Sequence, residues 1–116
     1  LIIDDEPMVA GALKRILAAE HEVSTSGSGQ VALDRIASGE RYDVILCDLL
    51  MPGMNGVELY DTLMGTIAEQ AQRMVFVTGG AFTPVTSSFL DRVPNQRIDK
   101  PFDAVGVRAL VRANVG

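Results

Sequence analysis

The sequence predicts an α/β fold: a three-layer α/β/α sandwich around a five-stranded parallel sheet of strand order 2-1-3-4-5. Short apolar runs alternate five times with segments of helical periodicity, which is typical of parallel strands joined by crossover helices. Two runs, 44–47 and 74–77, are continuously apolar, as expected of strands covered on both faces. A chain of 116 residues accommodates one compact domain, and right-handed crossovers leave few other strand orders.

The first half of the chain contains two predicted strand–helix pairs. Residues 1–3 form the end of a buried strand, and Pro7 stands at a first helical position, where its missing N–H costs no hydrogen bond. Residues at helical spacing then form an apolar face: Val9, Leu13, Ile16 and Leu17. We expect a short strand at 22–25 and a turn at 27–29. A second helix has the apolar face Ala32, Leu33, Ile36 and Ala37, and Gly39 ends it.

The middle of the chain is predicted to continue with a third strand and helix. The apolar run 44–47 ends abruptly at Asp48, and the turn-forming stretch 51–56 follows. Asn55 with Glu58 three residues later has the pattern of a helix N-cap and its capping-box partner. One helix is expected to follow, with the apolar face Tyr60, Leu63, Met64, Ile67 and Ala71.

The last part of the chain contains two further predicted pairs. The strand 74–77 precedes a fourth helix that opens at 83–84 and contains weak helix formers: Val85, Thr86, Ser87 and Ser88. We therefore expect the segment 83–91 to be labile. A brief strand at 97–99 precedes Asp103, which is predicted to cap a final helix. Its apolar face is Val107, Leu110 and Val111.

The composition excludes several classes of protein. A hydrophobic content of 47% and a charged content of 22% are typical of folded domains and exclude extended disorder. A net charge of −5 disfavours direct binding to nucleic acid, because phosphate backbones would be repelled. No apolar run approaches the roughly 20 residues of a membrane span, so we expect no membrane contact and a cytoplasmic location. The lone Cys47 fits a reducing compartment.

Polar side chains follow the strands at the points where they end: Asp4, Asp5, Asp48, Thr78 and Lys100. In the order 2-1-3-4-5 the four strands concerned are neighbours, so these side chains are expected to converge in one cleft. Three carboxylates this close would raise one another's pKa unless a cation neutralised them. Mg²⁺ is the expected ion, because it binds one or two carboxylates and completes its shell with water and phosphate oxygens.

Four motifs carry a resemblance to a known family: 2–7 (Ile-Ile-Asp-Asp-Glu-Pro), 48–56 (Asp-Leu-Leu-Met-Pro-Gly-Met-Asn-Gly), 77–79 (Val-Thr-Gly) and 100–102 (Lys-Pro-Phe). In this order and at these spacings the motifs are specific, and the match runs over essentially the whole chain. The sequence resembles the receiver domain of two-component response regulators, which has a flavodoxin-like fold. We expect 1–116 to be a single receiver domain from a larger protein, because the chain opens at Leu1 instead of Met.

The resemblance implies a phosphoacceptor and a metal site. Asp48 is the phosphoacceptor, whose carboxylate attacks the phosphoryl group of a phosphohistidine on a partner. Asp5 and Asp48 bind Mg²⁺ or Mn²⁺ directly, and the main-chain carbonyl of Leu50 is a third ligand. Asp4 acts through a bound water. The implied partner is a histidine kinase or a histidine phosphotransfer domain.

The resemblance also implies two groups that contact the phosphoryl oxygens. Lys100 pairs with these oxygens, and the Thr78 hydroxyl hydrogen-bonds one of them. Phosphoryl transfer depends on such positioned charge more than on covalent machinery, and lysine suits the task as a compact point charge. The bond between Lys100 and Pro101 is expected to be cis.

Other stretches resemble receivers that share a polypeptide with a hybrid sensor histidine kinase: 79–84, 89–90, 93–95 and 100–102. We therefore expect a hybrid kinase as the parent protein, in which case the parent is an enzyme and can be membrane-anchored. The alternative is the N-terminal receiver of a regulator with a DNA-binding or enzymatic output domain. The domain alone would catalyse only its own phosphorylation and dephosphorylation.

One residue departs from the family pattern. Family members usually carry Tyr or Phe three residues before the lysine, where this chain has Arg97. A guanidinium is not buried as a ring is unless an anion pairs with it. We expect the coupling between threonine and aromatic ring to be absent or altered, so that Asp48 serves as a relay station more than as an allosteric trigger.

Three other functions are disfavoured. A phosphatase of the haloacid dehalogenase kind needs an acid two residues after its nucleophile, where this chain has Leu50. A flavin-binding module on this fold needs a hydroxyl-rich phosphate loop, whereas the acidic residues 4–6 repel phosphate. A degenerate receiver used only for docking does not require the intact set of acids, threonine and lysine.

Overall fold

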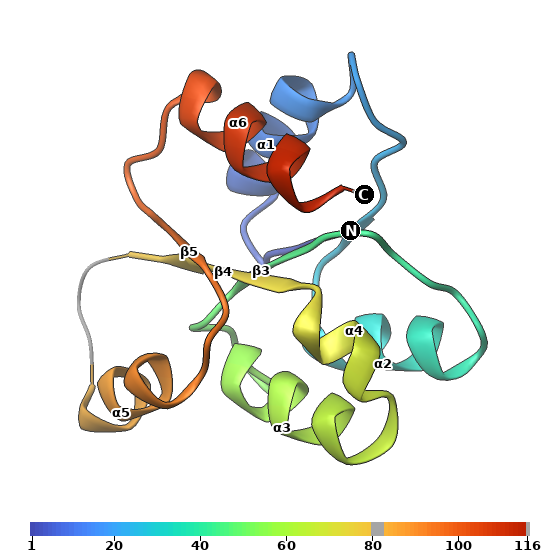
Figure 1. Ribbon diagram of the computed structural model, residues 1–116, viewed down its shortest axis with the longest axis vertical. Coiled ribbons are helices and arrows are strands. Elements are labelled where there is room, and N and C mark those ends of the chain that lie inside the picture. Colours follow the sequence, from blue (N-terminus) through green and yellow to red (C-terminus); the bar gives the residue numbers. More distant parts are fainter. Residues whose placement is uncertain (80–82, 116) are drawn as a thin grey trace.

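The structure is a computed structural model that describes residues 1–79 and 83–115, so residues 80–82 of the stretch that resembles hybrid-kinase receivers lie outside the described residues. Figure 1 shows a central sheet with α1 and α6 on one side and the other helices on the opposite side. The strands are β1 (Ile2–Ile3), β2 (Thr25–Ser26), β3 (Ile45–Asp48), β4 (Met74–Thr78) and β5 (Arg97–Asp99). The helices are α1 (Pro7–Leu17), α2 (Gly29–Ala37), α3 (Gly56–Thr66), α4 (Ala68–Gln72), α5 (Pro84–Arg92) and α6 (Ala104–Asn114).

The strand order is β2-β1-β3-β4-β5, and all neighbours are parallel, which confirms the predicted sheet. In the register of β3 and β4, Asp48 lies opposite Val77. In the register of β4 and β5, Thr78 lies opposite Asp99. The carboxyl ends of four neighbouring strands therefore meet at one edge of the sheet, as the sequence predicts.

Two hydrophobic clusters cover the two faces of the sheet. Alternate residues of β4 divide between them, since Phe76 packs towards α3 and α5, whereas Val75 and Val77 pack towards α1 and α6. Phe76, Tyr60 of α3 and Phe89 of α5 meet edge to face, with ring centroids 5.0–5.9 Å apart, the favoured arrangement of aromatic pairs. Within the described part of the chain, no helix is both long and apolar enough to cross a membrane.

Cys47 is fully buried in β3. Burial raises the pKa of its thiol, with the neighbouring carboxylates as smaller causes. The side chain is therefore a small hydrophobe of the core.

Two predicted elements are wrong in their bounds. The second strand was expected at 22–25, but β2 lies at Thr25–Ser26, because the hydrogen bonds that align it with β1 run to the carbonyls of Ser24 and Ser26. The third helix was expected to run unbroken to Ala71. It ends at Thr66, because the backbone of Ile67 leaves the helical region (φ −134°, ψ 70°), and α4 then begins.

Predicted helix starts are confirmed at three places. Asn55 and Glu58 form a full capping box at α3. Asp103 caps α6 by accepting a hydrogen bond from the amide of Gly106. Thr83 caps α5 by accepting a hydrogen bond from the Thr86 amide, and the Thr83 amide donates one to the hydroxyl of Thr86. These caps satisfy amides that the first turn of a helix leaves without intrahelical partners.

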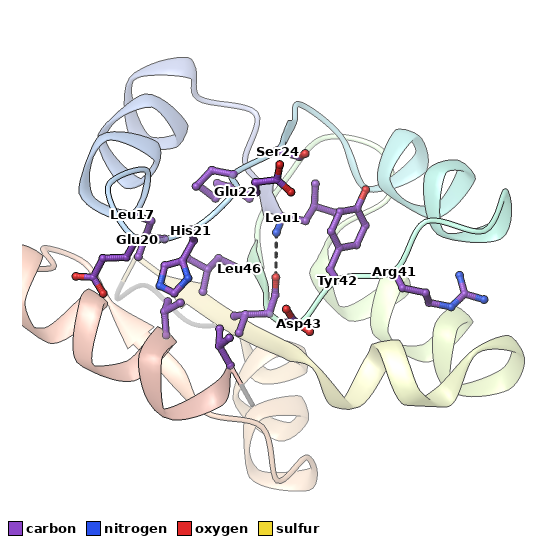
Figure 2. A pocket seen from close by; sticks show the side chains of 15 residues that line it. Leu1, Leu17, Glu20, His21, Glu22, Ser24, Arg41, Tyr42, Asp43 and Leu46 are labelled. Atoms are coloured by element: carbon purple, nitrogen blue, oxygen red, sulfur yellow. Dashed lines mark hydrogen bonds between the residues drawn. The ribbon is translucent and has the colours of Figure 1, made fainter.

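The amino ends of the strands border a pocket of about 460 Å³. Figure 2 shows that its wall combines the end of α1 with the chain before β2 and β3. Its labelled polar side chains include Glu20, His21, Glu22, Arg41, Tyr42 and Asp43. The predicted site residues lie at the opposite edge of the sheet, so this pocket is not the predicted cleft.

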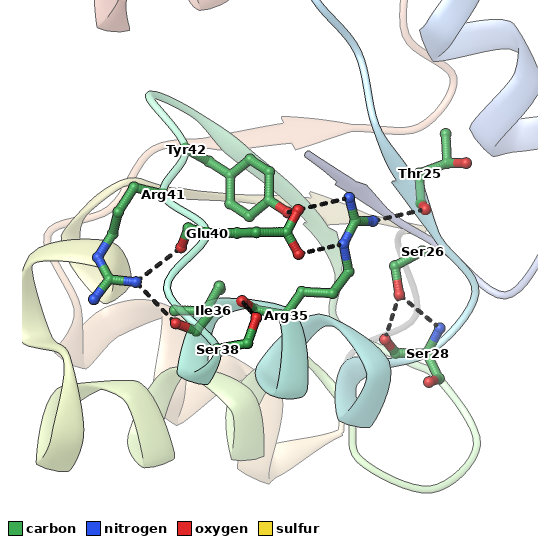
Figure 3. A network of polar contacts seen from close by, with 9 residues as sticks. All are labelled: Thr25, Ser26, Ser28, Arg35, Ile36, Ser38, Glu40, Arg41 and Tyr42. Carbon is green, nitrogen blue, oxygen red and sulfur yellow. Dashed lines mark hydrogen bonds and ion pairs between the residues drawn. The ribbon is translucent and has the colours of Figure 1, made fainter.

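Polar contacts hold the connection between α2 and β3 (Figure 3). Arg35 donates two hydrogen bonds to the carboxylate of Glu40 and a third to the Thr25 carbonyl, and the Tyr42 hydroxyl also donates to Glu40. The side-chain amide of Gln70, which is fully buried, bonds both the N–H and the carbonyl of Tyr42. This connection therefore ties α2 and α4 to the start of β3.

Candidate functional site

Three carboxylates meet where β1 and β3 end. Asp4 and Asp5 follow β1 directly, and Asp48 is the last residue of β3. One carboxylate oxygen from each of these residues lies within 4.8 Å of the others. Asp4 and Asp48 are buried, with 4% and 6% of their surfaces exposed, whereas Asp5 is exposed. The predicted acidic cluster is therefore present, with one of its members open to solvent.

Backbone amides hold one oxygen of each buried carboxylate. The Glu6 amide donates to Oδ1 of Asp4 over 2.9 Å, and the Leu50 amide donates to Oδ1 of Asp48 over 3.1 Å. The other oxygens face Lys100, whose Nζ lies 3.8 Å from Asp4 Oδ2 and 3.5 Å from Asp48 Oδ2. Each carboxylate therefore has one oxygen held by the backbone and one directed towards the cation.

The electrostatics of the cluster are dominated by burial. Desolvation raises the pKa of Asp48, while the Leu50 amide and Lys100 act in the opposite direction. Desolvation also raises the pKa of Asp4, and the nearby charge of Asp48 raises it further. The predicted repulsion among the acids is present, but removal from water is the larger cause.

The donor set fits a hard divalent cation. Oδ2 of Asp4 is buried and accepts no hydrogen bond from the residues that the structure describes, although the Lys100 amine lies 3.8 Å away. A buried carboxylate oxygen without a hydrogen bond is unfavourable, and a metal-bound water or an ion would relieve it. Mg²⁺ prefers oxygen ligands and uses one or two carboxylates, and the cluster of Asp4, Asp5 and Asp48 offers such oxygens.

Two glycines bring the loop after Asp48 close to its neighbours. A Cβ at Gly56, the first residue of α3, would lie 2.9 Å from the main-chain oxygen of Asp48 and 3.1 Å from Cα of Leu49. A Cβ at Gly29, the first residue of α2, would lie 2.5 Å from the main-chain oxygen of Met54. The loop is therefore held between two helix starts that have no room for a side chain.

Thr78 ends β4, as predicted, and is buried. Its hydroxyl has a partner that the sequence analysis missed. The Thr78 hydroxyl donates a hydrogen bond of 2.7 Å to Oδ1 of Asp99, its register neighbour on β5. The Lys100 amide donates to the Thr78 carbonyl, also over 2.7 Å. Arg97 lies on the same side of β5, with Nε 3.8 Å from the Asp99 carboxylate. The available signal for Asp99 was an acid at the last residue of the final predicted strand, directly before Lys100.

The peptide bond between Lys100 and Pro101 is cis, as expected. Lys100 follows β5 directly, with its amide donating a hydrogen bond to the Thr78 carbonyl and its amine directed at Asp4 and Asp48. Leu50 was predicted to bind the metal through its carbonyl, and the structure shows its amide donating a hydrogen bond to Asp48. The role of its carbonyl stays a prediction.

The fold and the site together define a class: a parallel α/β domain with an acidic cluster and a lysine at the carboxyl edge of its sheet. The sequence model of the family described as the response regulator receiver domain matches residues 1–112, and the chain belongs to this family. Receiver domains of this family act in two-component signalling, in which they interact with histidine kinases or phosphotransfer proteins, and they generally bind Mg²⁺ at an acidic pocket.

Individual relatives agree with this assignment. The response regulator ArlR of Staphylococcus aureus is 32% identical over 114 residues, which cover 97% of this chain and 50% of the relative. This chain therefore spans about half the length of the curated relatives that it matches.

Solved structures share the whole fold. A CheY-like response regulator receiver domain protein from Methanospirillum hungatei JF-1 is 28% identical with a TM-score of 0.82, over 99% of this chain and 91% of that one. The signal receiver domain of a signal transduction histidine kinase from Syntrophus aciditrophicus is 27% identical with a TM-score of 0.83, over 98% and 86%.

Proposed function

We propose that this chain is the phosphoacceptor domain of a two-component phosphorelay, and that Asp48 accepts a phosphoryl group from a phosphohistidine of a partner. The observation that carries the proposal is the environment of Asp48. Its carboxylate is buried at a strand end, with Oδ1 held by the Leu50 amide and Oδ2 3.5 Å from the Lys100 amine. This carboxylate is held in one orientation and lies beside the cation that a transferring phosphoryl group needs.

The proposed reaction is an in-line displacement at phosphorus. A carboxylate oxygen of Asp48 forms the new O–P bond while the N–P bond to the partner's histidine breaks. The histidine nitrogen keeps the electron pair of that bond and takes up a proton. Lys100 stabilises the charge on the phosphoryl oxygens, and the Thr78 hydroxyl is a further donor to one of them.

Asp5 and Asp48 would hold Mg²⁺ or Mn²⁺, with the Leu50 carbonyl as a third ligand and Asp4 acting through a bound water. The ion would supply positive charge to the equatorial phosphoryl oxygens. The orientation of the acids comes from residues of this chain. The Glu6 amide orients Asp4 and the Leu50 amide orients Asp48.

The parent protein is proposed to be a hybrid sensor histidine kinase, with this domain cytoplasmic and its partner a histidine kinase or histidine phosphotransfer domain. The stretches 89–90, 93–95 and 100–102 support this context, and a solved relative is the receiver of a histidine kinase. The N-terminal receiver of a response regulator is the second candidate, favoured by the similarity to ArlR. Within either parent, residues 1–116 are proposed to form one receiver domain.

The test is phosphorylation of the isolated chain by acetyl phosphate and Mg²⁺, followed by intact-mass measurement. We expect one base-labile phosphoryl adduct on the native chain and none on Asp48→Asn. Asp91→Asn, which changes an exposed acid of α5, is the matched control and should form the adduct. Failure of the native chain to form an adduct, or an adduct that persists in Asp48→Asn, would contradict the proposal.

A further inference from the structure

The hydrogen bond from Thr78 to Asp99 connects the candidate site to the edge strand of the sheet. β4 lies between β3 and β5. Asp48 belongs to β3 and Asp99 belongs to β5. The Thr78 hydroxyl donates to Asp99 over 2.7 Å, so its proton is directed from β4 towards β5, away from the strand that carries Asp48.

We propose that Asp99 is a positioning residue that holds the Thr78 hydroxyl in this orientation and thereby weakens the hold of the site on a phosphoryl group. The inference rests on the proposed function, because it concerns how Thr78 becomes available to a phosphoryl oxygen at Asp48. It adds to that function a competing acceptor within the chain.

The competition follows from the chemistry of a hydroxyl. A threonine hydroxyl carries one proton and donates one hydrogen bond at a time. While the proton is donated to Asp99, it is not available to a phosphoryl oxygen. Binding of a phosphoryl group therefore requires either that the Thr78–Asp99 bond breaks or that the site works without this donor.

The surroundings make the bond an effective restraint. Thr78 is 2% exposed, so its hydroxyl has little access to solvent as an alternative partner. The acceptor is a carboxylate, and hydrogen bonds to ionised acceptors are shorter and stronger than those between neutral groups. The adjacent Lys100 amide bonds the Thr78 carbonyl, which keeps Thr78 and Asp99 in register.

The side of β5 on which Asp99 lies also carries Arg97, whose Nε is 3.8 Å from the Asp99 carboxylate. Both side chains are largely exposed, so this ion pair contributes little to stability. It does place positive charge beside the acceptor of the Thr78 hydrogen bond. If the Thr78 hydroxyl donated its hydrogen bond to a phosphoryl oxygen instead, the Asp99 carboxylate would keep Arg97 and solvent as its partners.

The test compares the affinity of five proteins for beryllofluoride, a phosphoryl analogue, in the presence of Mg²⁺, by titration under NMR. We expect Asp99→Ala to bind about fivefold more tightly than the native chain, the ratio that one net hydrogen bond corresponds to. Asp99→Asn keeps an acceptor oxygen but loses the charge, so its hydrogen bond is weaker and its affinity should lie between those of the native chain and Asp99→Ala. Asp99→Ala placed on Thr78→Val should bind no more tightly than Thr78→Val alone.

Each contrary outcome identifies a different error. Equal affinity of Asp99→Ala and the native chain overturns the inference. If Asp99→Asn and Asp99→Ala increase the affinity equally, simple charge repulsion explains the effect and the inference is overturned. The same holds if Asp99→Ala still increases the affinity in the Thr78→Val background. If Asp99→Ala does not fold, Asp99→Val supplies a β-branched replacement for the strand and is held to the same expectation. If the native chain neither binds beryllofluoride nor becomes phosphorylated, the proposed function and the inference are both overturned. If the native chain is phosphorylated but binds beryllofluoride as tightly as Asp99→Ala does, the inference alone is overturned.

Discussion

Nζ of Lys100 lies 3.5 Å from Oδ2 of Asp48, so a lysine that follows β5 reaches across β4 to a carboxylate at the end of β3. The amine lies at a similar distance, 3.8 Å, from Asp4. A single lysine amine therefore lies near two buried acids, and the site holds positive charge near the proposed phosphoacceptor Asp48 before any phosphoryl group arrives. The contribution of Lys100 to phosphorylation can therefore be measured separately from that of a metal ion.

We expect Lys100→Met to slow phosphorylation by acetyl phosphate on the order of 100-fold, because a charge directed at the phosphoryl oxygens is lost. The affinity for Mg²⁺ should stay the same or rise, since a competing cation has been removed. Phosphorylation rates by intact mass and Mg²⁺ titrations measure the two effects. Lys14→Met removes an exposed lysine of α1 and is the control that should change neither. A fall in Mg²⁺ affinity in Lys100→Met would contradict this assignment.

The stability of the metal-free chain should fall as the pH rises through the weakly acidic range. Burial raises the pKa of Asp4 and of Asp48 in the folded state, so between the ordinary value and the raised value the folded chain holds protons that the unfolded chain has released. Stability therefore decreases with pH across that interval and levels off above it.

Thermal unfolding midpoints from about pH 4 to 7 measure this effect as the difference between the native chain and Asp48→Asn. The advantage of Asp48→Asn should grow with pH. The exposed ion pairs of Glu20 and Glu40 lower the pKa of those acids, but they are common to both proteins and cancel in the difference. Added Mg²⁺ should reduce the advantage, because a bound cation favours the ionised acids. An advantage independent of pH would contradict the prediction.

Gly56→Ala should destabilise the fold by about 1–3 kcal/mol, because the added Cβ would meet the main-chain oxygen of Asp48 at 2.9 Å. Gly65→Ala in the same helix is the matched control, since a Cβ there has no neighbour within 4 Å. It should be neutral or stabilise by up to about 1 kcal/mol. Urea unfolding of both variants gives the comparison, and equal effects would show that the close approach at Gly56 is not a constraint.

The helix α5 should exchange its amide hydrogens faster than α3. Only Thr86 and Phe89 of α5 are buried, against Gly56, Leu59, Tyr60 and Leu63 of α3. Segments with few buried apolar contacts open at lower free energy. Hydrogen exchange by mass spectrometry on the ligand-free chain measures this directly, and protection of 84–91 equal to that of α3 would contradict it.

Binding of beryllofluoride should perturb NMR signals at the carboxyl ends of the strands more than the face of β5 around Arg97. The side chain of Arg97 is about half exposed, 49%, so it does not occupy the buried place of an aromatic ring. Receivers that carry Tyr or Phe at this position are the comparison. Changes on β5 as large as in those receivers would show that a signal passes to this face without the ring.

Much of this fold was predictable from hydrophobic pattern and turn chemistry. The runs 44–47 and 74–77 are buried on both faces, so their continuous apolar character marks them as central strands. The caps at Asn55 and Asp103 follow from side chains that compete for backbone amides. The strand order was supported by family resemblance as well as by the alternation of elements.

The errors fall where local pattern carries little information. β2 is a two-residue strand at the edge of the sheet, with Thr25 exposed and Ser26 buried. Its register depends on pairing with β1 rather than on its own residues. α3 ends at Thr66, directly after Gly65, but an isolated glycine inside a helical pattern is tolerated and does not by itself mark a helix end. The Thr66 hydroxyl bonds the Thr62 carbonyl there, a local contact that competes with helix propagation but has no distinct sequence signal.

The acidic cluster and the lysine were predictable because strand ends converge in a parallel sheet. The partner of Thr78 was not, because the bond to Asp99 depends on the register between β4 and β5. A shift of one residue would turn the Asp99 side chain to the other face of the sheet. The prediction that 97–99 forms a strand therefore assigned no role to the Asp99 side chain.

The loop that follows Asp48 has a practical consequence for building chimeric receivers. It is bounded by Gly56 at the start of α3 and contacted by Gly29 at the start of α2, with no space for a methyl group at either residue. Transplanting residues 48–56 into another scaffold would therefore carry the required spacing only if the recipient also has glycine where α2 begins. The module to exchange is this loop together with both helix starts.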